Sequence, residues 1–174
     1  RRCPAALFMH PDMKSVIETS DIIKSIVSDY SDQIEYVALD EAYIDMSNTK
    51  QLFHKGDIFK TAREIKERIE EATGCSCSVG AGYSKYSAKI ASEEGKPNGL
   101  EKIMDKKELL NIISDRSVKV LYGVGKRMEI TLAENGLFKV RDIQMKTAEY
   151  MKEKFGVHGV SLYYITWGIN NREI

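Results

Sequence analysis

The sequence lacks the features that mark membrane proteins and disulfide-stabilised proteins. None of its apolar runs approaches the ~20 residues that a membrane-spanning helix needs, and no signal peptide is visible. Only three cysteines occur among 174 residues, and the spacing Cys75-Ser76-Cys77 fits neither a disulfide framework nor a zinc site. We therefore expect reduced cysteines that behave as small apolar residues, in a cytoplasmic protein with no membrane partner.

The sequence also lacks a net charge, because 26 basic residues balance 26 acidic ones. Domains that bind nucleic acid usually carry a basic patch, so the overall charge argues weakly against that class of protein. The charges are unevenly distributed, however. Residues 1–116 have three more acidic than basic residues, and residues 117–154 have three more basic than acidic ones. A metal-holding region followed by a phosphate-holding region would produce this distribution.

The chain is long enough, and at 43% hydrophobic apolar enough, to bury a core as one domain or two small ones. Residues 1–105 alternate between helical and strand patterns, and every pattern in residues 106–174 is helical. This order predicts an α+β fold, with two helices packed on one face of a small mixed sheet, followed by a small all-helical domain. We expect helices over residues 16–30, 57–72, 84–93, 106–113, 125–135, 140–144, 147–155 and 157–167, and strands over residues 34–39, 42–46, 75–81 and 100–104.

Two adjacent acidic residues, Asp40 and Glu41, lie between the first two predicted strands. Neighbouring side chains on a straight strand point to opposite faces, so these carboxylates can converge only where the chain turns tightly. Two carboxylates held at such a turn would suit a divalent metal such as Mg²⁺, which prefers oxygen ligands. Asp and Glu are also ordinary turn residues, and the dipeptide alone favours that interpretation.

A second motif, Gly123-Val124-Gly125-Lys126, precedes a predicted helix in the basic stretch. A Gly-x-Gly turn before a helix leaves backbone N–H groups unpaired beside the positive end of the helix dipole, which suits a phosphate group. The helix ends at Asn135-Gly136, as in a helix-hairpin-helix unit, which holds the nucleic-acid backbone without reading bases. The alternative is a glycine turn without a ligand, and the basic surroundings favour phosphate contact.

Three lysines follow the predicted strand 75–81. Lys85 and Lys89 lie four residues apart on a predicted helix, where lysines usually form a solvated face. Lys96 lies in the turn Gly95-Lys96-Pro97-Asn98-Gly99, which defines its backbone. An ammonium group held near a metal-bearing acidic pair is what a triphosphate would need. We interpret Trp167 as a core residue rather than a surface for stacking bases.

Taken in order, these motifs resemble the palm and thumb of a Y-family (DinB/UmuC-like, DNA polymerase IV-type) translesion DNA polymerase. Their order and spacing agree with that family over essentially the whole chain. One departure is Tyr122, where the family often has proline before the glycine motif. The resemblance is carried by Leu39-Asp40-Glu41-Ala42-Tyr43-Ile44-Asp45, Cys77-Ser78-Val79-Gly80 with Ser84-Lys85 and Ala88-Lys89-Ile90-Ala91-Ser92, Lys96-Pro97-Asn98-Gly99, Gly123-Val124-Gly125-Lys126, and Phe155-Gly156 with Gly168-Ile169-Asn170-Asn171-Arg172-Glu173-Ile174.

The resemblance implies a palm over residues 1–105, without its first strand and fingers, and a thumb with a helix-hairpin-helix over residues 106–174. It implies two-metal nucleotidyl transfer, with primer-template DNA and a deoxynucleoside triphosphate as substrates and two Mg²⁺ ions as cofactors. The residues it singles out are Asp40 and Glu41 for catalysis and metal binding, Lys96 for the triphosphate, and Gly123, Val124, Gly125, Lys126 and Lys89 for DNA.

The resemblance also implies parts that this chain does not include. A third catalytic aspartate would lie before Arg1, and a sliding clamp would bind through regions outside the chain. We therefore expect an excerpt of a longer DNA polymerase that is inactive by itself. Two alternatives are a palm-type nucleotidyl cyclase, which would not need a helix-hairpin-helix, and a non-catalytic polymerase-like DNA-binding protein, which would be expected to lose the acidic pair.

Overall fold

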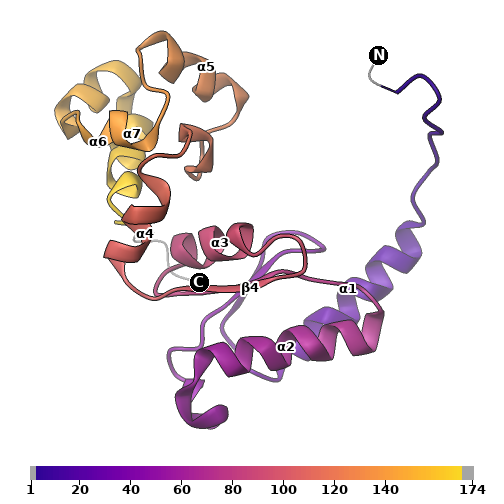
Figure 1. Ribbon diagram of the computed structural model, residues 1–174. Helices are drawn as coiled ribbons and strands as arrows, with labels where there is room; N and C mark the ends of the chain where they lie inside the picture. Colours follow the sequence, from indigo (N-terminus) through magenta and orange to yellow (C-terminus); the bar gives the residue numbers. More distant parts are fainter. Residues whose placement is uncertain (1–2, 170–174) are drawn as a thin grey trace.

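The computed structural model describes residues 3–169, which form an α+β region followed by an all-helical region (Figure 1). Three short 3-10 helices occur at Lys50–Leu52, His54–Gly56 and Val118–Val120. The other elements, in chain order, are α1 (Met13–Ser28), β1 (Ile34–Tyr36), β2 (Ala42–Ile44), α2 (Ile58–Thr73), β3 (Val79–Gly82), α3 (Lys85–Glu94), β4 (Leu100–Ile103), α4 (Lys106–Ile113), α5 (Lys126–Glu134), α6 (Val140–Gln144) and α7 (Ala148–Thr166).

The helices of the first region agree with the predicted ones to within one residue for α2 and α3, whereas α1 begins three residues earlier and ends two residues earlier than predicted. Capping residues fix their beginnings. Asp12 caps α1 by accepting hydrogen bonds from the backbone N–H groups of Lys14 and Ser15. The Asp57 side chain caps α2, which ends at Gly74 with a φ of 69°, a left-handed conformation that favours glycine. The Ser84 side chain caps α3 by accepting a hydrogen bond from the backbone N–H of Ser87.

The strands are shorter than predicted and form two separate pairs. β1 and β2 pair antiparallel, with Ile34 opposite Ile44, and β3 and β4 pair parallel, with Val79 opposite Leu100. The first ladder ends early because Val37 donates its backbone N–H to the Glu41 carbonyl, which closes a loop. Among residues 3–169, no ladder joins the two pairs, so the prediction of one mixed sheet is wrong for this part of the chain.

Helices cover both faces of the strand layer rather than one. In Figure 1, α1 and α2 lie together on one side of the strands and α3 lies on the other. The prediction of two helices on one face holds for α1 and α2 but omits α3. On the α1–α2 side, the buried apolar residues are Ile26, Val27, Tyr30, Met46, Ile65 and Ile69.

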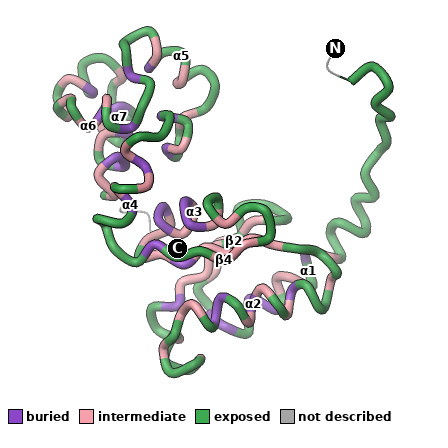
Figure 2. Tube along the Cα trace, in the orientation of Figure 1, coloured by how far each residue is buried: buried purple, intermediate pink, exposed green. Residues whose placement is uncertain are grey.

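The core of the helical region is continuous with the α3 side of the strands, as the buried segments in Figure 2 show. Tyr86 and Ile90 of α3 belong to the same buried cluster as Leu109 of α4 and Leu162 of α7. The sequence predicts two helices over residues 147–167, and the structure has α7 interrupted at Gly156, whose φ of 65° and ψ of −155° are not helical. Residues 170–174, at the end of the proposed thumb motif, lie outside the described residues.

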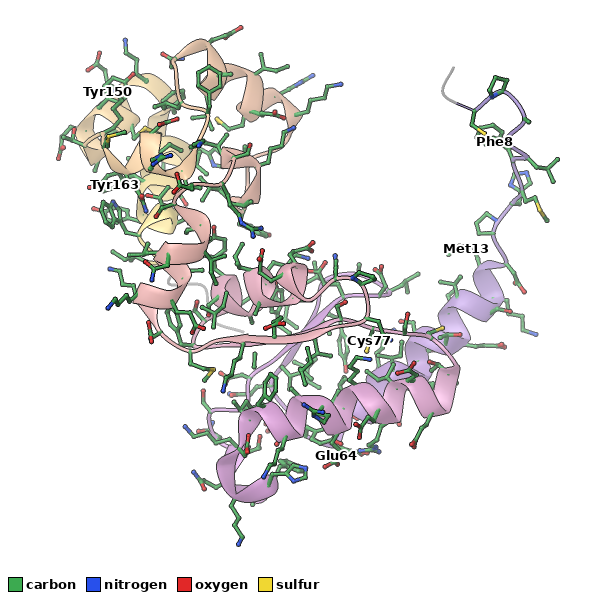
Figure 3. The ribbon with its side chains drawn as sticks, in the orientation of Figure 1. Phe8, Met13, Glu64, Cys77, Tyr150 and Tyr163 are labelled. Atoms are coloured by element: carbon green, nitrogen blue, oxygen red, sulfur yellow. The ribbon has the colours of Figure 1, made fainter. Side chains whose placement is uncertain are left out.

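The three cysteines are free, but only Cys77 is partly buried and packs as an apolar residue. Cys77 packs against the α1–α2 core (Figure 3), and burial raises the pKa of its thiol. Cys3 and Cys75 are exposed, so the expectation of apolar packing is wrong for both. None of the helices within residues 3–169 combines the length and apolar character that crossing a membrane requires.

Candidate active site and glycine hairpin

The two acidic residues lie in a tight loop, residues 37–41, which we call the carboxylate turn. The backbone N–H groups of Val37 and Ala38 both donate to the Glu41 carbonyl, at 2.9 and 3.2 Å. The Ser20 hydroxyl of α1 donates to the Leu39 carbonyl at 2.7 Å. The turn is therefore closed by its own backbone and anchored to α1, as a turn that positions ligands requires.

The two carboxylates of this turn have different surroundings. Asp40 is exposed and makes no ion pair with any residue from 3 to 169. Glu41 is half-buried, and its Oε1 lies 2.9 Å from Nζ of Lys89 on α3. Burial opposes the charge on Lys89, but its hydrogen bond and attraction to Glu41 outweigh this effect and raise the lysine pKa. The resemblance assigned Lys89 to DNA, and the structure places this lysine against Glu41 of the acidic pair.

A small pocket lies beside the carboxylate turn. It has a volume of about 40 Å³, far below the ~300 Å³ or more typical of ligand pockets, so it cannot enclose a nucleotide by itself. Tyr122, just before the glycine hairpin, also lines this pocket, so the helical region reaches the edge of the pocket. The pocket is lined by Glu35, Val37, Glu41, Tyr43, Lys85, Tyr86, Lys89 and Tyr122.

Lys85 is one of the walls of this pocket and does not form the solvated face that the sequence predicted. Its side chain is only 13% exposed, its Nζ lies 2.5 Å from Oε2 of Glu35, and it sits 5.0 Å from the centre of the Tyr43 ring. Burial and then the charge of Glu41 raise the pKa of Tyr43, so this tyrosine stays neutral. The α3 lysines therefore face the β1–β2 hairpin.

Lys96 is linked to the carboxylate turn only indirectly. Its Nζ lies 2.7 Å from Oε1 of Glu93, and the same oxygen lies 3.5 Å from Nζ of Lys89. The ion pairs thus form a series from Glu41 through Lys89 and Glu93 to Lys96. The structure puts Lys96 on the same side of α3 as the acidic pair, without direct contact between them.

The glycine hairpin, residues 123–125, has the features of a phosphate seat. Gly123 has a φ of 90°, which favours glycine. Gly125 begins α5 without a capping side chain, so no side-chain oxygen occupies the first N–H groups of that helix. A Cβ on Gly125 would meet nothing within 4 Å, so the space beside this residue is open.

A histidine that the sequence did not single out supports this hairpin. His158 of α7 lies with Nε2 3.2 Å from the Gly123 carbonyl. Nothing in the local sequence links the two residues, which are 35 positions apart. The break in α7 at Gly156 places His158 in the first turn after the break. The glycine, rather than the histidine, is therefore the sequence feature that could have pointed to this contact.

Basic residues near the hairpin differ in whether they are already paired with an acidic residue. Lys126 and Arg127, at the start of α5, make no ion pair with another residue of the described chain. By contrast, Lys119 pairs with Glu129 at 2.9 Å, and Arg141 pairs with Asp115. In the described chain the element immediately before the hairpin is the 3-10 helix Val118–Val120, and α4 ends at Ile113, so no full helix directly precedes the turn of the predicted helix-hairpin-helix.

The donor chemistry of the carboxylate turn suits a hard divalent cation. Asp40 offers a free carboxylate and Glu41 a second one in the adjacent position, and oxygen ligands of this kind are those that Mg²⁺ prefers. Within residues 3–169, no cluster of three or more acidic, histidine or cysteine residues could complete such a site. The residues present therefore fit part of a Mg²⁺ site.

Comparison with known proteins gives one family. The impB/mucB/samB family model matches residues 1–93, a little more than half of the chain. DNA polymerase IV of Francisella tularensis subsp. holarctica (strain FTNF002-00 / FTA) is 34% identical over 174 residues, which cover 100% of this chain and 49% of that protein. DNA polymerase IV of Fusobacterium nucleatum is also 34% identical, over 99% of this chain and 49% of that protein.

Solved structures agree with the sequence relatives. The crystal structure of DinB from Sulfolobus solfataricus matches with a TM-score of 0.82 and 26% identity, covering 98% of this chain and 50% of that one. An insertion ternary complex of Dbh DNA polymerase matches with a TM-score of 0.84 and 25% identity, covering 99% and 50%. The chain thus spans about half the length of the relatives it matches.

Proposed function

Because the chain belongs to the impB/mucB/samB family and is DinB-like and Y-family in both sequence and fold, we propose that it is part of a template-directed translesion DNA polymerase. The longer protein is called the parent protein below. Its proposed activity is nucleotidyl transfer from a deoxynucleoside triphosphate to the 3′ end of a primer paired with a template. The chain alone would be inactive, because it spans only about half of its relatives.

The observation that supports this proposal most directly is the carboxylate turn. Asp40 and Glu41 are adjacent, fixed between β1 and β2, and anchored to α1 through Ser20. We propose that these two residues hold Mg²⁺ in the parent protein, together with an acidic residue outside this chain. When bound, two such ions would activate the primer hydroxyl and neutralise charge on the leaving pyrophosphate.

The remaining residues would bind and orient the substrates. Lys96, half exposed and held by Glu93, would bind the triphosphate as a point charge. Residues 1–105 would act as the palm and residues 106–174 as the thumb. The glycine hairpin and the free Lys126 would hold the DNA backbone, in the manner of a helix-hairpin-helix. We propose that Lys89 also approaches DNA once it leaves Glu41, and that the parent protein works in the cytoplasm.

The same fold leaves two other functions to be tested against this one. A nucleotidyl cyclase would use a similar metal-binding turn but has no need for a glycine hairpin that faces phosphate. A non-catalytic DNA-binding relative would not need an anchored acidic pair. The open approach to Gly125 argues against the first, and the free carboxylate of Asp40 argues against the second.

One set of assays on the parent protein separates the three functions. The protein is incubated with Mg²⁺ and either a primed template with four deoxynucleoside triphosphates or a nucleoside triphosphate alone. We expect primer extension that stops at the template position of an omitted nucleotide, and no cyclic product. Formation of a cyclic nucleotide without DNA, or DNA binding with no extension on several templates, would contradict the proposal.

A further inference from the structure

A single ammonium group, that of Lys89, contacts the carboxylate by which Glu41 would bind a metal ion. Lys89 Nζ is 2.9 Å from Glu41 Oε1, with the lysine side chain 34% exposed and the glutamate side chain 37% exposed. The pair is therefore partly shielded from solvent and salt. The neighbouring Asp40 has no such partner among residues 3–169. Of two adjacent carboxylates, one is free and the other is occupied by a cation that the chain itself supplies.

Lys89 also has a second acceptor on its own helix. Glu93 lies four residues further along α3, and its Oε1 is 3.5 Å from Lys89 Nζ. This spacing places both side chains on one face of the helix, so they can pair without any change in the backbone. Lys89 can therefore release Glu41 and remain paired with a carboxylate. Glu93 Oε1 also lies 2.7 Å from Nζ of Lys96, so both lysines hold the Glu93 carboxylate.

We infer that Lys89 is an internal competitor for the cation site at the carboxylate turn. This inference rests on the proposed function, because it requires that Asp40 and Glu41 bind a divalent cation. A cation bound at either oxygen of the Glu41 carboxylate would lie close to the Lys89 ammonium group, which now contacts Oε1, and the two positive charges would repel each other. Lys89 lowers the affinity for the metal and turns toward Glu93 when the metal binds. It is a positioning residue, which keeps Glu41 in place until then.

The inference is tested by Mn²⁺ binding to this chain, followed by the electron paramagnetic resonance signal of free Mn²⁺. Lys89→Met removes the charge and keeps the length of the side chain. Lys89→Arg keeps the charge. Lys85→Met is the matched control, because it removes one charge from the same pocket but pairs with Glu35 rather than Glu41. Circular dichroism and thermal unfolding establish that each variant is folded.

We expect Lys89→Met to bind Mn²⁺ roughly three- to tenfold more tightly than the original chain, a ratio on the scale of a partly shielded ion pair. Lys89→Arg should bind it no more tightly than the original chain, and Lys85→Met should change the affinity less than Lys89→Met. Equal or weaker binding by Lys89→Met, including no binding at all, would overturn the inference. An equal gain in affinity for Lys85→Met would also overturn it, because any lost positive charge in the pocket would then have the same effect.

A separate comparison tests whether Asp40 and Glu41 bind the cation at all. Asp40→Asn and Glu41→Gln are therefore combined with Lys89→Met. If Mn²⁺ binding by the double variants equals that of Lys89→Met, the cation is held elsewhere, and the proposed role of the acidic pair is wrong. If Asp40→Asn and Glu41→Gln abolish Mn²⁺ binding while Lys89→Met does not strengthen it, the metal site is supported and only the competition by Lys89 is excluded.

Discussion

A Cβ atom on Gly80 would lie 2.1 Å from the carbonyl oxygen of Ala88, so β3 and α3 touch through their backbones at this point. The same atom would lie 2.3 Å from the backbone nitrogen of Ser92. Neither neighbour is a flexible side chain that could move aside. The absence of a side chain at Gly80 therefore sets the distance between the strand and the helix that carries Lys85 and Lys89.

Gly80→Ala should destabilise the fold, because either β3 or the backbone of α3 must shift. We expect a loss of about 1–3 kcal/mol in the free energy of unfolding, the usual cost of overpacking, measured by urea denaturation. Gly125→Ala is the control, because its Cβ would meet nothing within 4 Å. It should cost less than about 1 kcal/mol, as a change of N-cap residue. Equal losses in the two variants would contradict the close approach of β3 and α3.

The stability of the α1–α2 side should depend on acid through Glu64 of α2 (Figure 3). The Tyr30 hydroxyl donates to Glu64 Oε1 at 2.6 Å, and Nε2 of His54 lies 2.6 Å from Oε2. These hydrogen bonds, that of Tyr30 first, lower the pKa of Glu64 below its ordinary 4.5. A lowered folded-state pKa adds stability above the unfolded pKa, and this stability is lost as the pH falls through the folded value.

Glu64→Gln should therefore be less stable than the original chain at neutral pH and lose less stability between about pH 5 and pH 3. Urea unfolding at several pH values measures the free energy of unfolding of both proteins, and the difference between them should shrink as the pH falls. Glu67→Gln, on the same helix but without a hydrogen bond or ion pair to another described residue, should follow the original curve. If Glu64→Gln keeps the full pH dependence, the Tyr30 and His54 contacts do not stabilise the fold.

Much of the secondary structure could be predicted from the sequence, because it depends on local signals. Asp12, Asp57 and Ser84 cap their helices with their own side chains, and Gly156 interrupts α7 between the two helices predicted there. Which part of an apolar stripe becomes buried could not be predicted. Val16 of α1 is 41% exposed while Val27 is 3% exposed, a difference that depends on which neighbours pack against each end.

The pairing of charges in the candidate site was beyond local reasoning for the same reason. The acidic pair itself could be identified, because it interrupts two apolar runs. The Lys89–Glu41 contact joins residues 48 positions apart, and the Lys85–Glu35 contact joins residues 50 apart. A lysine on a helix face has the same local signal whether it meets water or a carboxylate. Only the close approach of α3 to the strands turns Lys85 and Lys89 inward.

Gly125→Val should weaken the binding of duplex DNA by the helical region. Gly125 has a φ of −82° and a ψ of 177°, extended backbone that valine accepts, and its Cβ would point into open space. The branched side chain should block phosphate from the first N–H groups of α5, giving a several-fold loss of affinity. Fluorescence anisotropy of a labelled duplex at one salt concentration measures this loss.

The control for this variant is Met145→Val, which also places a branched side chain on the helical region, at a position that is 73% exposed and lies after α6 rather than in the hairpin. It should bind DNA as the original chain does. Folded Gly125→Val with unchanged affinity would remove the glycine hairpin from the DNA interface. The basic residues near α5 would then be an ordinary solvated surface.

Lys96→Ala in the parent protein should raise the KM for the incoming nucleotide and leave duplex binding almost unchanged. The lysine side chain is 54% exposed, so its loss should cost little stability. We expect about a tenfold rise in KM, since one charge contact with phosphate is lost. Steady-state single-nucleotide insertion measures the change. Lys107→Ala, which removes a charge from the exposed surface of α4, should have no effect, and a similar KM for both variants would exclude Lys96 from the nucleotide site.

The central claim is that the carboxylate turn is the catalytic metal site of a polymerase. Single-turnover primer extension by the parent protein tests it most directly, with Asp40→Asn compared with Asp45→Asn. Asp45 is a matched control just beyond β2, because its carboxylate accepts the Ser47 backbone N–H at 2.8 Å and has no assigned role in catalysis. Asp40→Asn should slow extension by at least about a hundredfold, and Asp45→Asn should leave the rate within about threefold of the original. Extension by folded Asp40→Asn at the rate of Asp45→Asn would contradict the account.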